Sequence, residues 1–482
     1  MAEEKIKLKR KLGLAHGMAI IIGLVVGGGI YITPQGVLMH AGSPGLTLII
    51  WIIGGIHSLF GALCYAELGV NFPSAGAEYA YLSEMYSPYF GFMQLSIYLL
   101  LLRPGSNSFK AVLLGRYILK PLYPDCQVPT KAVLCVASFM TMSMCALNYR
   151  SVKFSARGQS FMTSITITTL LCIIASGIYF VVKGDVENLS EPFHHSATSV
   201  GDIVMSFYST VFAYSGWNAL NVLVEEVKNP KRTLPISIVV SSLTLTILYT
   251  LVNYSYLVVL GKEGVLKSDA VAVSVGLRVW TPLAWVMSLC IAVTACASFN
   301  SGILVGSRVA FAGARAGHLP EMISYVSLSY FTPVISVIAQ GILILVFIWF
   351  VTLDSIIKNL TFCYAICELI VILGLVRIRL KERKNLDVYK DKLKMPLFVL
   401  LIYAVSLTII TIVPLVANFQ ASALIFVIVV LVASAFYAAF VLWRPDFVTK
   451  NNAIDGMNNF VQKLFFCAPG GKNELTNKIL ED

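Results

Sequence analysis

The chain has 482 residues, of which 57% are hydrophobic and 13% are charged, whereas soluble domains carry about 25% charged residues. Its mean hydropathy of +0.79 is incompatible with a soluble globular protein and indicates a chain that crosses a membrane many times. The net charge of +11 does not indicate nucleic-acid binding, because the basic residues gather in loops on one side of the membrane.

Twelve segments are long and apolar enough to cross a bilayer as helices, which requires about 20 residues each. We expect these spans near residues 14–37, 45–68, 90–118, 131–149, 160–183, 201–224, 236–260, 281–308, 332–351, 356–377, 396–416 and 422–443. They divide the chain into an N-terminal tail (1–13), ten core spans (14–378), a basic loop (379–395), two further spans (396–443) and a C-terminal tail (444–482). The basic loops predict that both termini lie in the cytoplasm.

Span one contains three consecutive glycines in the stretch "VVGGGIYITP", residues 25–34. Glycine costs about 1 kcal/mol relative to alanine in a helix interior, so the triplet weakens the helix three times. One interpretation is a break that lines a binding cavity, since unwound backbone inside a membrane must be satisfied by protein or by an aqueous cavity. The other is a close contact between helices, which small residues allow.

Cys126 lies in the expected outward loop between spans three and four. The other nine cysteines fall inside spans or on the cytoplasmic side, where disulfides are not expected. A single outward cysteine indicates either an intermolecular bridge or a free thiol, and the residues alone leave both open.

A second interruption lies in span six, where Ser215 and Gly216 stand in "FYSTVFAYSGWNALN", residues 207–221. The two breaks are five spans apart. Because five is odd, two repeats of five helices would enter the membrane in opposite senses. Matched interruptions in inverted repeats point to a transporter binding site, so we expect spans 1–5 and 6–10 to be the repeats.

The breaks predict a site for an α-amino acid held by backbone atoms. Free amides and the positive end of the half-helix that restarts at the glycines suit a carboxylate. Carbonyls freed before the breaks suit an ammonium group. The candidate substrate-binding residues are Val25, Gly27, Gly28, Gly29, Ile30, Phe212, Ser215 and Asn218. Phe212 is a candidate lid over the ligand, although packing explains most aromatic residues in membrane helices.

Enzyme motifs are missing. The six histidines form no H-E-x-x-H pattern and no Cys/His metal spacing, and there is no P-loop. We therefore expect no enzyme activity, no metal and no cofactor, and no ATP-driven pumping by this chain.

The chain resembles the light-chain subunits of the heteromeric amino-acid transporters, within the amino acid–polyamine–organocation superfamily. The resemblance covers nearly the whole chain, and its motifs include "IIIGLVVGGGIYITPQGVL", "FAYSGWNALNVLVEEVKNPKRTLP" and "GSRVAFAGARAGHLPEM". It implies an all-α membrane protein with a LeuT-like fold of twelve helices, in which helices 1 and 6 are discontinuous within a 5+5 inverted repeat.

The same resemblance implies a plasma-membrane protein that exchanges amino acids without sodium. It also implies a disulfide from Cys126 to a single-span glycoprotein heavy chain. The glycine triplet matches the family's carboxylate-binding turn, Val25, Phe212 and Ser215 match its ammonium-binding carbonyls, and Phe212 matches its gating aromatic.

Three positions depart from the family pattern. Thr166 stands where most members have a lysine in span five, and Tyr364 stands where the similar cystine/glutamate exchanger carries an arginine. Ser215 replaces the aspartate of the member that accepts dibasic substrates. These departures weaken an assignment to acidic or to cationic substrates.

Lys110 and Glu368 are charged residues within predicted spans, where charge is expensive and usually functional. One hypothesis is that both face the substrate cavity and pair with each other. The alternative is that each reaches the membrane surface or pairs elsewhere. If unpaired, Lys110 could bind an acidic side chain.

The sequence therefore predicts a sodium-independent exchanger of neutral amino acids, large or aromatic ones included. An exchanger of anionic amino acids such as cystine, glutamate or aspartate is the alternative within the class. A non-transporting scaffold or amino-acid receptor is the alternative from another class.

Overall fold

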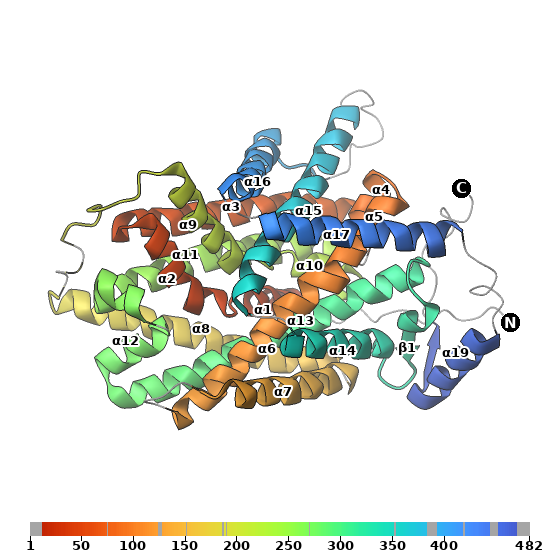
Figure 1. The fold of residues 1–482 in the computed structure, drawn as a ribbon, viewed down its shortest axis with the longest axis horizontal. Coiled ribbons are helices and arrows are strands. Elements are labelled where there is room, and N and C mark those ends of the chain that lie inside the picture. The colour runs from red at the N-terminus through yellow and green to blue at the C-terminus, as the bar shows by residue number, and fades with distance from the viewer. Residues whose placement is uncertain are drawn as a thin grey trace.

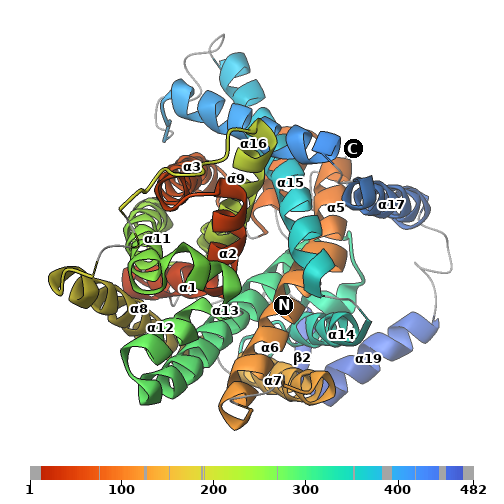
Figure 2. The same ribbon diagram turned by 60° about the vertical axis from the view of Figure 1, so that its left-hand side comes forward.

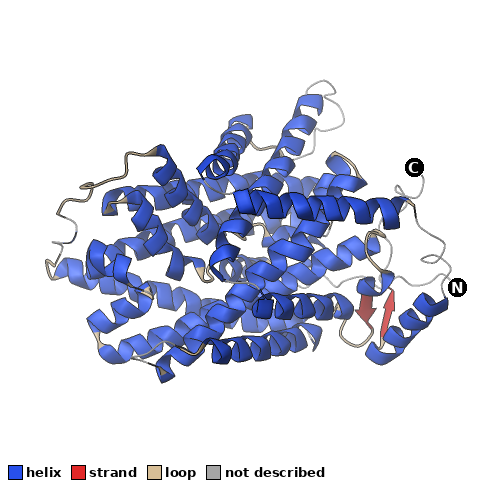
Figure 3. Cartoon of the chain, in the orientation of Figure 1, coloured by secondary structure: helices blue, strands red, loops and turns tan. Residues whose placement is uncertain are grey.

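The protein is described here by a computed structural model. It describes residues 12–74, 76–123, 128–150, 152–185, 188, 190–268, 270–350, 353–382, 393–417, 420–443 and 452–469. Over these residues the chain is a bundle of helices with one short pair of strands (Figure 3).

The first half of the chain supplies one interrupted helix, made of α1 and α2, and the longer helices that follow it, with the short helix α4 between α3 and α5. They are α1 (Leu14–Val25), α2 (Gly29–Ala41), α3 (Pro44–Asn71), α4 (Glu78–Met85), α5 (Pro88–Ile97), η1 (Tyr98–Leu102, a π-helical turn), α6 (Arg103–Leu119), η2 (Lys120–Leu122), α7 (Thr130–Arg150) and α8 (Val152–Val182).

The second half repeats this pattern and adds a C-terminal part. Its elements are α9 (Val200–Tyr214), α10 (Ala219–Val222), η4 (Val224–Glu226), α11 (Pro230–Lys267), α12 (Val271–Val279), α13 (Thr281–Arg315), η5 (Glu321–Ser324), β1 (Tyr325–Ser327), α14 (Val334–Phe350), α15 (Leu353–Glu382), α16 (Leu397–Ala417), α17 (Gln420–Phe436), η6 (Tyr437–Leu442), α19 (Asn452–Phe465) and β2 (Cys467–Pro469). The two strands pair antiparallel.

Among the described residues, seven helices are long and apolar enough to cross a membrane, and eight if α1 and α2, which meet at 45°, form one bent span. Helix α14 and part of α16 are apolar but shorter. A helix lies at each of the twelve predicted segments. These lengths do not establish the number of spans, so twelve stays a prediction.

The first break lies between α1 and α2, where Val26, Gly27 and Gly28 are not helical. The glycines also pack closely. A Cβ added to Gly28 would lie 2.5 Å from Leu113 Cδ2, and one added to Gly29 would lie 2.7 Å from the Ala213 Cα. The triplet therefore interrupts the helix and also lets its backbone approach neighbouring helices at the same place, whereas the predicted binding role stays a prediction.

The second break separates α9 from α10 over residues 215–218. Ser215 has extended backbone dihedrals, and Gly216 has a φ of +109°, a region that L side chains rarely adopt. A Cβ on Gly216 would lie 3.1 Å from Leu24 Cγ, at the end of α1. The two predicted breaks are thus confirmed as breaks, and they lie side by side.

The interrupted helices sit inside the bundle. Many long helices, α3, α7, α8 and α14 among them, run along the long axis of the molecule (Figure 1). Helix α1 packs against α8, α11 and α13, and α2 packs against α9 (Figure 2). Helices in matching positions of the two halves also pack together, α3 on α11 and α6 on α13.

Two buried ion pairs close the end of the bundle where α1 begins. Arg308 Nε lies 2.8 Å from Glu226 Oε1, and Arg315 Nη2 lies 2.7 Å from Glu225 Oε1. Backbone bonds from Leu12 to Glu226 (2.9 Å) and from Lys228 to Leu12 (2.7 Å) tie the start of α1 to the chain that follows α10.

Candidate functional site

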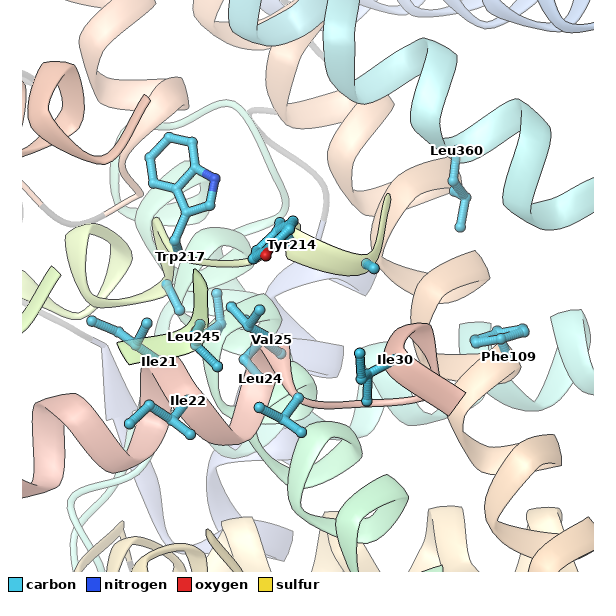
Figure 4. Close-up of a cluster of buried hydrophobic side chains, with 14 of the residues drawn as sticks. Ile21, Ile22, Leu24, Val25, Ile30, Phe109, Tyr214, Trp217, Leu245 and Leu360 are labelled. Atoms are coloured by element: carbon cyan, nitrogen blue, oxygen red, sulfur yellow. The ribbon is translucent and has the colours of Figure 1, made fainter. Parts of the chain in front are cut away.

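A cavity lies where the two breaks meet, and α6 and α15 complete its wall. Ten of the twelve predicted site or selectivity residues line it. They are Val25, Gly27, Gly28, Gly29, Lys110, Phe212, Ser215, Asn218, Tyr364 and Glu368. The close-up of the neighbouring apolar cluster shows Leu24 and Val25 of the first break beside Tyr214 and Trp217 of the second (Figure 4).

Two predicted residues do not line the cavity with their side chains. Ile30 is fully buried in the core, so only its backbone amide, in the first turn of α2, is available to a ligand. Thr166 is also fully buried, and its hydroxyl lies 3.2 Å from Thr294 Oγ1 and donates to the Met162 carbonyl at 3.0 Å.

Thr166 belongs to a set of neutral hydroxyl contacts between α1, α8 and α13. Thr163 donates to the Ala19 carbonyl at 3.0 Å, and Ser298 donates to the Leu24 carbonyl at 2.8 Å. Hydrogen bonds between neutral groups therefore occupy the region in which the family resemblance leads one to expect a lysine.

The predicted carboxylate end of the site is backbone. Helix α2 begins at Gly29, and the amides of Tyr31 and Ile32 donate to the Gly28 carbonyl at 3.2 and 3.1 Å. The amides of Gly28, Gly29 and Ile30 have no backbone acceptor among the described residues, and they lie at the positive end of the helix dipole. Glycine at these positions leaves no Cβ between the amides and a ligand. The arrangement suits an anion at the start of α2.

The ammonium end consists of carbonyls that already have partial partners. The Val25 carbonyl accepts from the Gly27 amide at 2.7 Å and from Tyr249 Oη at 3.1 Å. The Phe212 carbonyl accepts from the Ser215 amide at 3.2 Å and from its hydroxyl at 2.8 Å. A ligand ammonium would compete with these donors, so binding at this end includes rearrangement of Ser215.

Phe212 lines both cavities in this region, the first one and a second, adjacent one. Its ring packs edge-on against Phe109, with 5.9 Å between centroids. This position is compatible with the predicted lid, and the lid role stays a prediction.

The two charged residues singled out from the sequence both line the cavity, but they do not pair there. Glu368 accepts a hydrogen bond from Tyr403 Oη at 2.7 Å. Over the described residues, no hydrogen bond or ion pair joins the Lys110 ammonium to Glu368. Each charge is therefore available to the cavity separately.

Arg103 lines the cavity as well. Its guanidinium donates to the Tyr98 hydroxyl and lies 4.7 Å from the centroid of the Tyr98 ring. The Arg103 guanidinium is thus held by Tyr98 of the adjacent π-helical turn η1. It also contributes a positive charge to the wall of the cavity.

Glu78 is the site residue that sequence reasoning missed. It is buried at the start of α4 and accepts a hydrogen bond from the Asn218 side chain at the second break. Burial raises the pKa of the Glu78 carboxyl, against the hydrogen bonds that lower it. Glu78 lies outside every predicted span. The only signal in the sequence that could have indicated a role in the site is the stretch around it, "SAGAEYAY".

Cys126, the predicted bridging cysteine, lies outside the described residues. The nine cysteines in the described part of the chain are all free thiols.

The sequence of the chain is similar to known proteins over most of its length. An amino acid permease family model matches residues 12–454. The chain is 34% identical to the human cystine/glutamate transporter over 441 residues, which are 92% of this chain and 87% of that protein. It is 32% identical to the mouse b(0,+)-type amino acid transporter 1 (91% and 89% covered) and 32% identical to the human Asc-type amino acid transporter 1 (96% and 88% covered).

Proposed function

The chain belongs to the amino acid permease family, among the light chains of the heteromeric amino-acid transporters, and from this we propose that it exchanges amino acids across a membrane without sodium. The observation that carries the proposal is the cavity between two broken helices, whose ends present amides on one side and carbonyls on the other. These groups complement the carboxylate and the ammonium that all α-amino acids share.

We propose neutral amino acids as the substrates, on the charge balance of the cavity. Arg103 and Lys110 bring two positive charges, whereas Glu368 and, behind Asn218, Glu78 bring two negative ones. A substrate whose side chain is uncharged leaves this balance intact. The aromatic residues Phe109, Phe212 and Tyr364 in the wall suit large side chains.

Anionic amino acids are the second candidate, and a separate observation favours them. The ammonium of Lys110 is without an ion-pair partner in the described structure and borders the cavity, where it could bind an acidic side chain. One relative is named a cystine/glutamate transporter, whereas the other two named above carry the names of other amino-acid systems.

Sodium independence is proposed on the family to which the chain belongs. In the region of Thr166, the hydroxyls of Thr163, Thr166 and Ser298 bond to carbonyl or hydroxyl oxygens of neighbouring helices, so these groups already have partners within the protein. We further propose twelve spans in two inverted repeats. The matched breaks and the packing of α3 on α11 and of α6 on α13 support the repeats.

The heterodimer is also a proposal for this chain. We propose a disulfide from Cys126 to a single-span heavy chain, residence in the plasma membrane and cytoplasmic termini, on the family and the distribution of basic loops.

Counterflow in proteoliposomes tests the exchange. Vesicles that hold the chain with a heavy chain are preloaded with unlabelled leucine, and labelled leucine or glutamate is offered outside with choline replacing sodium. Uptake that requires preload supports an exchanger, and the preferred label decides the substrate class. Uptake without preload would contradict exchange, and no uptake with any heavy chain would favour a scaffold or receptor.

A further inference from the structure

Glu368 is a carboxyl group inside the bundle that the binding of the amino-acid backbone does not use. It lines the substrate cavity, and it also lines a second cavity between α3, α9, α15 and α16. Its side chain is partly open to these cavities, so water and ions that enter the cavity can reach it.

The partner of Glu368 is a hydroxyl and not a cation. Oε2 accepts from Tyr403 Oη at 2.7 Å, and the described residues record no ion pair to this carboxylate. A charge without a counter-ion at such depth is expensive, whereas a protonated carboxyl is not. The group is therefore one that can hold either charge state within a transport cycle.

The groups around Glu368 come from α3, α4, η1, α6, α9 and α16 as well as from its own helix, α15. On α16, Tyr403 is bonded to it, and the ring of His57 from α3 packs 4.8 Å from the Tyr403 ring. His57 is itself held by Ser406, with 2.9 Å between Nδ1 and Oγ. The remaining titratable or charged groups in the described structure that share a cavity or an electrostatic interaction with Glu368 are Tyr65, Glu78, Tyr98, Arg103, Lys110, Tyr214, Tyr364 and Cys367.

The charge state of Glu368 sets which side chains the cavity accepts. Arg103, Lys110 and Glu368 line the cavity, and Glu78 lies behind Asn218; with all four ionised these charges balance, and an acidic substrate would meet the Glu368 carboxylate in the same cavity as Lys110. With Glu368 protonated, the cavity carries one net positive charge. An acidic side chain then restores neutrality, with Lys110 as its partner.

On the basis of the proposed exchange of amino acids, we propose that Glu368 takes up one proton together with each acidic substrate. The carboxylate oxygen of Glu368 binds a proton from the side on which the cavity is open, and it releases this proton on the other side when the acidic substrate leaves. Neutral amino acids move with Glu368 ionised and carry no proton. The same site thus moves either one neutral amino acid or one acidic amino acid plus a proton.

Linkage makes this measurable at equilibrium. If protonation favours glutamate, glutamate favours protonation by the same factor. The dissociation constant of glutamate is expected to fall by up to about tenfold for each unit of decreasing pH in the range where Glu368 titrates, as one-proton linkage requires. The dissociation constant of leucine is expected to stay flat over the same range.

The decisive experiment measures protons and substrate together. Proteoliposomes that hold the chain with its heavy chain are preloaded with leucine and a pH-sensitive dye, in sodium-free buffer with K⁺ and valinomycin to clamp the voltage. External glutamate is expected to acidify the interior by one proton per glutamate that enters. External leucine is expected to exchange without any pH change.

Three variants assign the proton to Glu368. Glu368→Gln is expected to admit glutamate without acidification and without pH dependence, and Glu368→Asp is expected to keep both. Glu263→Gln is the matched control, because Glu263 is an exposed carboxylate paired only with Lys267 at 3.2 Å on the surface, and it is expected to couple protons as the unmodified chain does.

Each contrary outcome has a distinct meaning. Glutamate entry without acidification in the unmodified chain, or acidification that persists in Glu368→Gln, overturns the proton role of Glu368. No glutamate entry at any pH in vesicles that exchange leucine overturns the inference and leaves the proposed exchange of neutral amino acids standing. Vesicles that exchange neither substrate overturn the proposed function itself.

Discussion

At the scale of single residues, Lys110 bears most directly on substrate choice. It is buried on α6, borders the cavity and lies one residue after Phe109, the ring that packs on the candidate lid Phe212. A charge-assisted hydrogen bond contributes about 1.5–3 kcal/mol, which corresponds to roughly tenfold to a hundredfold in affinity.

Replacement of Lys110 by methionine is therefore expected to lower glutamate exchange by about tenfold or more, while leucine exchange changes by less than about threefold. The measurement is initial counterflow of each label at low pH. Lys267→Met, at an exposed lysine, is the control. An equal loss for both substrates would mean that Lys110 supports the structure and does not select the substrate.

Residue types were predictable from the sequence, but their partners were not. The composition of spans three and ten marks Lys110 and Glu368 as unusual, and both do line the cavity. Their hypothesised pairing is absent, because Tyr403 from α16 reaches Glu368. The Glu78–Asn218 hydrogen bond could not be predicted from the sequence either, since it depends on the packing of α4 against the second break.

At the scale of elements, the two breaks were the strongest prediction. Glycine and serine in mid-span weaken the helix through local backbone effects, which can be predicted without knowing which helices pack nearby. The exact neighbours of each glycine came only from the structure. Gly29 lies so close to α9 that an added Cβ would be 2.7 Å from the Ala213 Cα, whereas Gly36, two turns later on α2, has nothing nearer than Ser209 Oγ at 3.8 Å.

Gly29→Ala is expected to push α2 away from α9 and to disturb the carboxylate site. Overpacking of this kind costs about 1–3 kcal/mol, and we expect at least a tenfold loss of leucine counterflow. Gly36→Ala, the matched control on the same helix, is expected to retain counterflow. Full activity in Gly29→Ala would show that the close approach of α2 to α9 is not required.

The ion pairs between α13 and the segment after α10 belong to the same scale. Arg308 and Glu226 are both almost completely buried and lie 2.8 Å apart. Removal of one partner from a buried pair strands the other charge and costs about 3–5 kcal/mol.

Arg308→Met is therefore expected to lower the melting temperature in detergent clearly, and Arg308→Met with Glu226→Gln is expected to recover part of the loss, because the second change removes the stranded carboxylate. Thermal unfolding of the purified chain measures both. A double variant that is less stable than Arg308→Met alone would contradict the importance of this pair.

At the scale of the whole molecule, the order of the helices could be predicted because each span must be long and apolar. Every predicted segment carries a helix. The arrangement that brings residues 25–29 of α1 and α2 beside residues 212–218 was indicated by the two matched interruptions five spans apart, and the family resemblance implies the same arrangement. The bridge of Cys126 to a heavy chain is also a property at this scale.

Cys126→Ser is expected to remove the covalent heterodimer without abolishing exchange, because the sequence predicts Cys126 in an outward loop between spans three and four, away from the breaks in spans one and six. Non-reducing gel electrophoresis of the co-expressed subunits measures the bridge, and counterflow measures activity. Cys135→Ser, at an exposed free thiol on α7, is the control. A covalent heterodimer that survives Cys126→Ser would assign the bridge to another cysteine.

The central claim is that both broken helices hold the substrate through their backbone, and a cryo-EM map of the heterodimer in saturating leucine tests it most directly. We predict that the leucine carboxylate lies within hydrogen-bonding distance of the amides at the start of α2, near Gly28 and Gly29. We predict that its ammonium lies at the carbonyls of Val25 and Phe212. Leucine bound elsewhere, or bound here with its carboxylate on Lys110 instead of the α2 amides, would contradict it.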